Sequence, residues 1–131
     1  MNDVILCVDD ERVVLESIRS MLENEFKGKI SIEIASDGQE ALELLHELEE
    51  ENAKVRILIT DWLMPKLKGD ELISKTHELY PQMKKIMITG QADQEAIAKV
   101  KTLGGLDKLF LKPWNSREIL NTLHQYLIEK S

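Results

Sequence analysis

The chain is organised around the stretch Val55-Arg-Ile-Leu-Ile-Thr-Asp-Trp-Leu-Met-Pro-Lys-Leu-Lys-Gly69. Residues 57–59 form a short apolar run rich in β-branched side chains, which is typical of a strand buried on both faces of a parallel sheet. Pro65 and Gly69 prevent the strand from continuing. We therefore expect Asp61 to stand at the carboxyl end of a central strand, where open α/β sheets place their chemistry. Taken alone, Asp61 would most simply be a solvated residue that opens a loop.

Apolar runs and helical patterns alternate along the rest of the chain. The runs predict further strands at residues 4–8, 30–34, 85–89 and 109–111. The 30–34 run alternates strictly between apolar and polar residues, which indicates an edge strand with one wet face. Asp37 with Glu40, and Asn115 with Glu118, have the spacing of helix N-caps, and Gly28 is a stop signal for the first helix.

Apolar residues at helical spacing predict five helices. The side chains expected to face the core are Val14, Ile18, Met21 and Leu22 in the first helix, Ala41, Leu44, Leu45 and Leu48 in the second, Leu72, Ile73, Thr76, Leu79 and Tyr80 in the third, Ala96, Ile97, Val100 and Leu103 in the fourth, and Ile119, Leu123, Tyr126 and Leu127 in the fifth. Five β–α units in strict alternation predict one α/β domain over residues 1–131, a doubly wound parallel sheet with helices on both faces.

Composition narrows the function classes. The 131 residues are 43% hydrophobic and 31% charged, as in soluble globular domains, and no apolar run approaches a membrane span. A net charge of −7 argues against nucleic-acid binding by this segment, which would need a clustered basic face. The single cysteine, Cys7, cannot form an internal disulfide and is expected to be a buried, unreactive thiol in a cytoplasmic protein.

Polar residues follow four of the five predicted strands at the point where each strand ends. They are Asp9, Asp10, Asp61, Thr89 and Lys112. If the first and third strands are neighbours, the three carboxylates converge and repel one another unless a cation lies among them. Oxygen ligands without histidine or cysteine favour a hard ion such as Mg²⁺. Three carboxylates, Mg²⁺ and one lysine leave no net charge, so a phosphoryl group could approach.

These residues, together with Met64-Pro65, Gly69 and Lys112-Pro113, resemble the receiver domain of two-component response regulators. The resemblance covers the whole chain, and all five signature positions appear in order at predicted strand ends. It implies a flavodoxin-like fold with sheet order 2-1-3-4-5. It also implies partners, namely a sensor histidine kinase or histidine phosphotransfer protein that donates a phosphoryl group.

The resemblance assigns a role to each matching position. Asp61 would be the phosphoacceptor. Asp10 and Asp61 would bind Mg²⁺ directly, with Asp9 acting mainly through water and Leu63 offering its backbone carbonyl. Thr89 would hydrogen-bond the phosphoryl group and Lys112 would pair with it, and the Lys112–Pro113 bond is expected to be cis.

One departure concerns the switch. The aromatic residue that usually lies three places before the lysine is replaced here by Leu109, and Phe110 is one place off. Phe110 and Leu109 point to opposite faces of a strand, so Phe110 is on the wrong face unless a bulge shifts the register. We therefore expect Thr89, the loop to Gln91 and Leu109 to carry the switch. The surface of the fourth helix, fifth strand and fifth helix would be the responding partner or homodimer face.

Two other function classes compete. Aspartyl-phosphate phosphatases of the haloacid dehalogenase type also use Asp, Thr and Lys near Mg²⁺, but they need an acid two residues after the nucleophile, and Leu63 cannot donate a proton. A degenerate receiver that acts only as an interaction module would lack an acidic residue or the lysine, and both are present here. The sequence leaves open the output and whether the chain is a stand-alone receiver or part of a longer protein.

Overall fold

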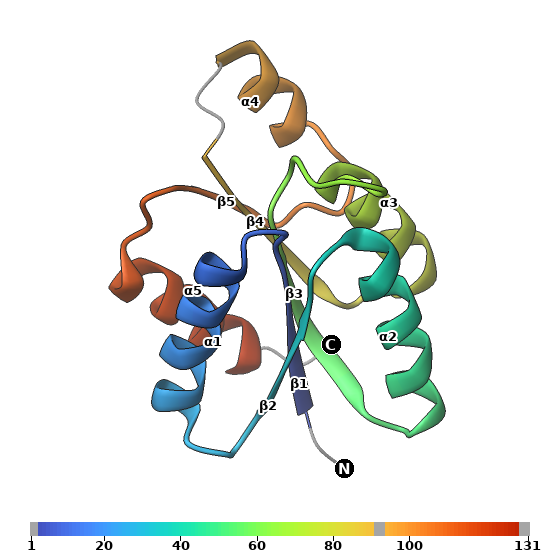
Figure 1. The fold of residues 1–131 in the computed structure, drawn as a ribbon, viewed down its shortest axis with the longest axis vertical. Coiled ribbons are helices and arrows are strands. Elements are labelled where there is room, and N and C mark those ends of the chain that lie inside the picture. Colours follow the sequence, from blue (N-terminus) through green and yellow to red (C-terminus); the bar gives the residue numbers. More distant parts are fainter. Residues whose placement is uncertain (1–2, 91–93, 129–131) are drawn as a thin grey trace.

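A computed structural model describes residues 3–90 and 94–128 of the chain. The elements alternate from end to end (Figure 1). The strands are β1 (Asp3–Val8), β2 (Ser31–Ala35), β3 (Lys54–Thr60), β4 (Lys84–Thr89) and β5 (Lys108–Leu111). The helices are α1 (Arg12–Phe26), α2 (Gly38–Glu50), α3 (Gly69–Leu79), α4 (Gln94–Lys101) and α5 (Ser116–Ile128).

All strand pairs are parallel, and the sheet order is β2-β1-β3-β4-β5, as the resemblance implied. This order makes β1 and β3 neighbours, so Asp9 and Asp61 follow adjacent strands at the same edge of the sheet. β2 lies at an edge, and its residues before Ala35 are only half-buried. The alternating pattern of residues 30–34 was therefore a correct indication of an edge strand.

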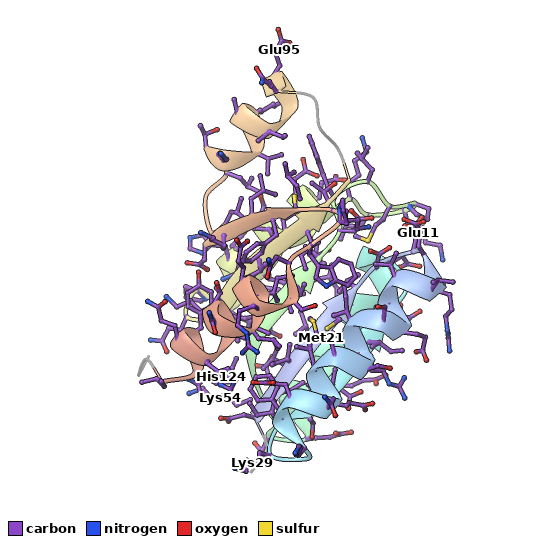
Figure 2. All side chains as sticks on the ribbon, turned by 90° about the vertical axis from the view of Figure 1, so that its left-hand side faces the viewer. Glu11, Met21, Lys29, Lys54, Glu95 and His124 are labelled. Atoms are coloured by element: carbon purple, nitrogen blue, oxygen red, sulfur yellow. The ribbon has the colours of Figure 1, made fainter. Side chains whose placement is uncertain are left out.

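Helices cover both faces of the sheet, with α1 and α5 on one side and α2 and α3 on the other (Figure 1). The strand side chains alternate between two apolar clusters. Ile57, Ile59, Ile86, Ile88 and Phe110 pack with α1 and α5, whereas Leu58 and Met87 pack with α2, α3 and Val100 of α4. Figure 2 shows α1 and α5 side by side on the near face, and there His124 Nε2 of α5 lies 2.6 Å from Glu25 Oε2 of α1.

The sequence signals predicted for one helix end and two helix starts are confirmed. Lys27 and Gly28 both have positive φ after α1, which confirms the stop signal at Gly28. Asp37 accepts a hydrogen bond from the Glu40 amide, and Asn115 accepts one from the Glu118 amide, so both N-caps form.

Several core predictions were inexact. Half-buried residues that were expected to face the core include Tyr80, Ile97, Leu103, Tyr126 and Leu127. In α1 the buried stripe is Leu15, Ile18, Leu22 and Phe26, while Val14 and Met21 are half-buried, because the helix is rotated slightly from the predicted face. Leu44 is also half-buried. Leu79 was expected to face the core but is 64% exposed, since the buried stripe of α3 ends at Thr76 and the helix itself ends at Leu79. The side chain of Ala96 lies outside what the structure describes.

None of the described helices is both long and apolar enough to cross a bilayer.

Candidate phosphoryl-transfer site

The site lies where β1, β3, β4 and β5 end. Asp9 is 2% exposed and Asp61 is 8% exposed, so both carboxylates are largely withdrawn from water. The Asp61 amide donates to the Val8 carbonyl oxygen at 2.9 Å, which continues the pairing of β3 with β1 to the strand end. The topology thus holds two buried carboxylates against each other, an arrangement that is costly without a compensating cation.

Lys112 provides one compensating charge. Its Nζ lies 3.0 Å from Asp9 Oδ2, 3.4 Å from Asp61 Oδ2 and 3.7 Å from Glu11 Oε1. The Lys112 amide donates to the Thr89 carbonyl oxygen at 2.9 Å, so β4 and β5 position the lysine together, and the Lys112–Pro113 bond is cis as expected. With three carboxylates and one ammonium, this group of residues keeps a net charge of −2.

The pKa values of Asp9 and Lys112 respond to this arrangement. Burial raises the pKa of the Asp9 carboxyl, against the hydrogen bonds from the Glu11 amide and Lys112, and the charge of Asp61 raises it further. Burial by itself would lower the pKa of Lys112, but the hydrogen bond to Asp9 and the charge of Asp61 raise it above its ordinary value. Lys112 is therefore a permanent cation at physiological pH.

The loop after β3 positions the Asp61 carboxylate. The Trp62 amide donates to Asp61 Oδ1 at 2.8 Å, which leaves Asp61 Oδ2 facing Lys112. The Gly69 amide donates to the Trp62 carbonyl oxygen at 2.6 Å and closes the loop. A Cβ at position 69 would collide with the Asp61 carbonyl oxygen, so this close approach requires glycine.

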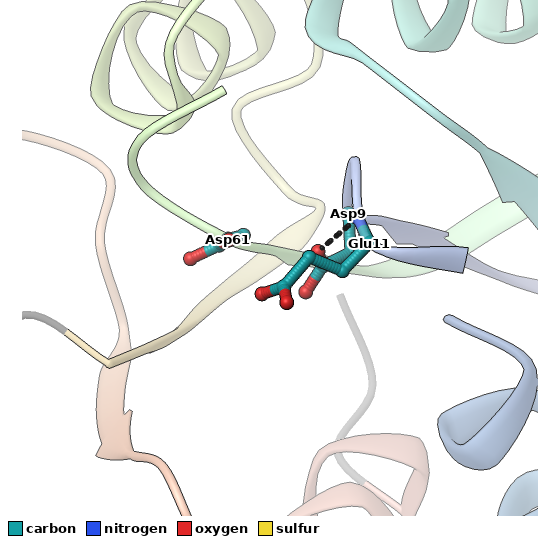
Figure 3. Close-up of side chains that lie close together, drawn as sticks. All are labelled: Asp9, Glu11 and Asp61. Carbon is teal, nitrogen blue, oxygen red and sulfur yellow. Dashed lines mark hydrogen bonds between the residues drawn. The ribbon is translucent and has the colours of Figure 1, made fainter. Parts of the chain in front are cut away.

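Three carboxylates could together hold a metal ion, and they are not quite the three that the sequence predicted. Asp9, Glu11 and Asp61 offer oxygens that all lie within 4.8 Å of one another (Figure 3). Asp10 is exposed and does not join them. The reason is local, because the Glu11 amide donates to Asp9 Oδ1 at 2.9 Å and this tight turn brings Glu11 beside the site. Carboxylate oxygens of this kind fit Mg²⁺.

The other predicted site residues also lie at this edge. Thr89 is 2% exposed at the end of β4, on the same sheet face as Met87. Leu63 is 49% exposed in the loop after Asp61, whereas Met64, the next residue, is buried in the apolar cluster with Leu72. The register of β4 and β5 shows no bulge, which places Leu109 beside Met87 in the cluster shared with α4 and Phe110 beside Ile88 on the opposite face. Gln91 lies outside the described residues.

Sequence reasoning missed Glu11 as a member of the site. The signal was present, since Asp9-Asp10-Glu11 is a run of three acidic residues after a strand, but strand alternation does not extend into a turn. Sequence reasoning also did not indicate that Lys85, at the opposite edge of the sheet, would be buried. It is 1% exposed, and its Nζ donates to the carbonyl oxygens of Tyr80 and Met83.

Comparison with known proteins agrees with this geometry. A sequence profile described as the response regulator receiver domain matches residues 5–124. A chemotaxis protein CheY homolog from Campylobacter jejuni is 31% identical over 126 residues, which cover 94% of this chain and 91% of that protein. The uncharacterized transcriptional regulatory protein YesN from Bacillus subtilis is 33% identical over 95% of this chain but only 32% of its own length.

Solved structures have the same fold. The response regulator receiver domain protein (CheY-like) from Methanospirillum hungatei has a TM-score of 0.79 and 35% identity, over 97% of this chain and 94% of that one. The signal receiver domain of an HD domain-containing protein from Pseudomonas fluorescens has a TM-score of 0.81 and 29% identity, over 96% and 87%. The chain spans about a third or less of the first curated relatives that it matches.

Proposed function

Because the chain belongs to the response regulator receiver domains, we propose that Asp61 accepts a phosphoryl group from a phosphohistidine donor in a Mg²⁺-dependent reaction. The observation that carries this proposal is the position of the Lys112 ammonium, 3.4 Å from Asp61 Oδ2 and 3.0 Å from Asp9 Oδ2. A cation held against a buried carboxylate beside a buried threonine is the arrangement that an acyl phosphate needs.

The proposed transfer uses Asp61 as the nucleophile. A carboxylate oxygen of Asp61 bonds to phosphorus while the P–N bond to the donor imidazole breaks, and its electron pair returns to the imidazole nitrogen. Lys112 and the Thr89 hydroxyl donate hydrogen bonds to the phosphoryl oxygens in the product. Transfer of this kind depends on positioning and charge neutralisation, so few residues are required.

Mg²⁺ would supply the remaining positive charge at the site. In this proposal Asp10 and Asp61 bind the ion directly, the Leu63 carbonyl oxygen adds a third ligand, and Asp9 acts through water. Glu11 lies beside Asp9 and Asp61, so it is the carboxylate that would compete with Asp10 for the ion. Asp10 is exposed, so its side chain can rotate toward the site at little cost.

The proposed donor is a sensor histidine kinase or a histidine phosphotransfer protein, which implies a cytoplasmic location. Exposed apolar side chains surround the carboxyl edge of the sheet, namely Val13 (83% exposed), Leu63 (49%) and Leu111 (47%). They would contact the donor while Asp61 approaches the phosphohistidine. The chain would promote its own phosphorylation and dephosphorylation but turn over no separate substrate.

The proposed output face is formed by α4, β5 and α5. A groove of about 660 Å³ is formed by β5, α5 and the loop between them, and is lined among others by Leu109, Leu111, Trp114 and Asn121. We propose that phosphorylation rearranges the start of α4 and this groove, which then binds a downstream partner or a second copy of the chain.

Labelling of the phosphoacceptor tests the function. Acetyl phosphate or a phosphohistidine donor should label the wild-type chain in the presence of Mg²⁺ and should not label Asp61→Asn. Asp61→Asn should fold normally and be somewhat more stable without metal, because one carboxylate is removed from a site with net charge −2. Full labelling of Asp61→Asn would refute the assignment, and Asp70→Asn, at the start of α3, serves as the matched control.

A further inference from the structure

The α2–α3 side of the molecule carries a feature that phosphoryl transfer does not use. A groove of about 440 Å³ runs between the two helices and is lined by Leu42, His46, Glu49, Lys75, Glu78, Leu79 and Tyr80. It shares Glu49 and Tyr80 with a second hollow of about 370 Å³ at the amino edge of the sheet. The groove lies on the side of the sheet that α2 and α3 cover, and Figure 1 shows these two helices on that side.

The floor of the groove is apolar and exposed. Leu79 is 64% exposed although it lies at the end of a well-formed helix, and Leu42 and Tyr80 are half-buried beside it. The Tyr80 hydroxyl donates to Glu49 Oε2 at 2.7 Å, which ties the end of α3 to α2 and holds this end of the groove in shape. An exposed leucine in a concave site is typical of a surface that contacts an apolar side chain of a partner.

The two helices carry an unusual concentration of negative charge. Residues 38–51 contain six glutamates and no lysine or arginine, and residues 69–79 contain three acidic residues and one lysine. Their combined net charge of −8 exceeds the −7 of the whole chain, so the rest of the molecule is nearly neutral. The net negative charge of this protein is therefore carried by α2 and α3.

Helical spacing places these carboxylates along the rims of the groove. Glu43 and Glu50 lie three residues before and four residues after His46, on the same side of α2. Glu71 and Glu78 lie four residues before and three residues after Lys75, on the same side of α3. The two basic side chains that line the groove, His46 and Lys75, are thus each flanked by two carboxylates, and His46 Nε2 lies 3.6 Å from Glu50 Oε1.

We propose that this groove is a docking site for a basic amphipathic helix of a partner protein. Leucine-like side chains of the helix would pack on Leu42, Leu79 and Tyr80, while its lysines and arginines would face the glutamates on both rims. The charge pattern disfavours an anionic membrane or a nucleic acid, both of which this layer would repel. The site is on the opposite side of the sheet from α1 and α5 and away from the carboxyl edge, so it would serve a second partner.

A designed peptide provides the probe. We would use a peptide of leucine and lysine only, with leucines at i, i+3, i+4 and i+7, and follow backbone amide NMR shifts of the unphosphorylated chain at physiological ionic strength. Shifts should concentrate on α2 and α3 around Leu42, His46 and Leu79. A peptide of the same composition with scrambled leucines, and a leucine–glutamate peptide with the original spacing, should both bind at least about tenfold more weakly, equivalent to roughly 1.4 kcal/mol.

Matched variants test whether the peptide binds in the α2–α3 groove. Leu79→Asn should weaken binding of the leucine–lysine peptide about tenfold, whereas Ile128→Asn, at an 80% exposed position on α5, should leave it unchanged. Glu43→Gln with Glu78→Gln should weaken binding and reduce its salt dependence. Shifts on another face, equal binding of the scrambled peptide, or equal effects of the Leu79 and Ile128 substitutions would each overturn the proposal.

The experiment is independent of the proposed phosphoryl transfer. Leu79→Asn should be labelled by acetyl phosphate as fully as wild type, and Asp61→Asn should bind the peptide as tightly as wild type. Loss of labelling in Asp61→Asn therefore bears only on the site at the carboxyl edge, and loss of peptide binding in Leu79→Asn bears only on the α2–α3 groove.

Discussion

At the scale of single residues, the loop from Asp61 to Gly69 shows how closely chemistry and packing are joined. Asp61 has one oxygen held by the Trp62 amide and the other facing Lys112, while its carbonyl oxygen leaves no room for a side chain at position 69. Leu63, in the same loop, is half-exposed and offers no polar group. Leu63 is therefore the side chain of this loop at which water access to Asp61 can be tested without disturbing the contacts of Asp61 itself.

Leu63 should therefore set the lifetime of the phosphoryl-aspartate. It cannot orient an attacking water, so we expect a relatively long-lived acyl phosphate. Leu63→Asn adds a hydrogen-bonding side chain and should speed loss of label about tenfold, corresponding to roughly 1.4 kcal/mol. Leu63→Val, which keeps the position apolar, is the control. An unchanged or slower rate in Leu63→Asn would show that this side chain does not govern water access.

Tyr80 offers a test that depends on pH. Burial, then the hydrogen bond to Glu49 and its charge, raise the pKa of Tyr80 to about 12 from 10.0. Between these values the unfolded chain ionises Tyr80 before the folded chain does, so the contribution of this residue to stability is complete below pH 10 and falls as pH rises. Glu49→Gln should lower the pKa but keep it above 10, because burial remains. Ultraviolet titration in a Tyr126→Phe background measures it, and a pKa unaffected by Glu49→Gln would show that burial alone is responsible.

At the scale of elements, the two faces of β5 pack in different apolar clusters. Its four residues alternate so that Leu109 packs with the cluster that includes Val100 of α4, and Phe110 packs with α1 and α5. Phe110 is 8% exposed, so its ring is part of the core and has little space in which to move. The register argument is confirmed, and it leaves no aromatic ring on the α4 face of this strand.

The switch should consequently act without an aromatic residue of β5. Beryllofluoride with Mg²⁺ should shift amide signals of Thr89, Leu109 and the start of α4 in NMR spectra of the wild type. Phe110→Leu should destabilise the chain by about 1–2 kcal/mol through lost packing but retain these shifts. If Phe110→Leu erased the shifts in α4, Phe110 would be the switch and our interpretation of the strand would be wrong. Leu109→Ala tests the converse and should reduce the shifts.

At the scale of the whole molecule, charge is distributed unevenly. The carboxyl edge of the sheet gathers Asp9, Glu11 and Asp61 around Lys112, and the α2–α3 layer carries most of the remaining negative charge. In the first of these groups Asp9 and Asp61 are buried, so their repulsion is costly, whereas the charges of the second group are exposed and are screened by water and salt. Global stability should thus respond to a cation at the carboxyl edge.

Mg²⁺ should stabilise the fold measurably. At a concentration one hundred times its Kd the ion adds about 2.7 kcal/mol to the free energy of unfolding, which for a domain of this size raises Tm by roughly 10 °C. EDTA should reverse the gain. Asp10→Asn should reduce it more than Glu11→Gln if Asp10 is the direct ligand, and the opposite order would assign that role to Glu11. Equal gains in wild type and Asp61→Asn would place the ion elsewhere.

Local sequence patterns were sufficient to predict much of the fold of this protein. The run at residues 57–59, the stop at Pro65 and Gly69, and the placement of Asp9, Asp61, Thr89 and Lys112 at strand ends all depend on periodicity and turn chemistry, which act over a few residues. Strict alternation of strands and helices then restricts the chain to a doubly wound parallel sheet, because right-handed crossovers allow few alternatives. The resemblance to receiver domains added the strand order, and the structure has that order.

Only the tertiary structure decided which acidic side chain joins Asp9 and Asp61. A turn has no fixed alternation, so the hydrogen bond from the Glu11 amide to Asp9 sets the direction of residues 9–11. The same holds for Leu79, exposed where α3 ends, and for Lys85, buried because the carbonyl oxygens of Tyr80 and Met83 satisfy its ammonium. Each of these outcomes depends on groups outside the periodic part of an element, and such contacts exist only once the chain has folded.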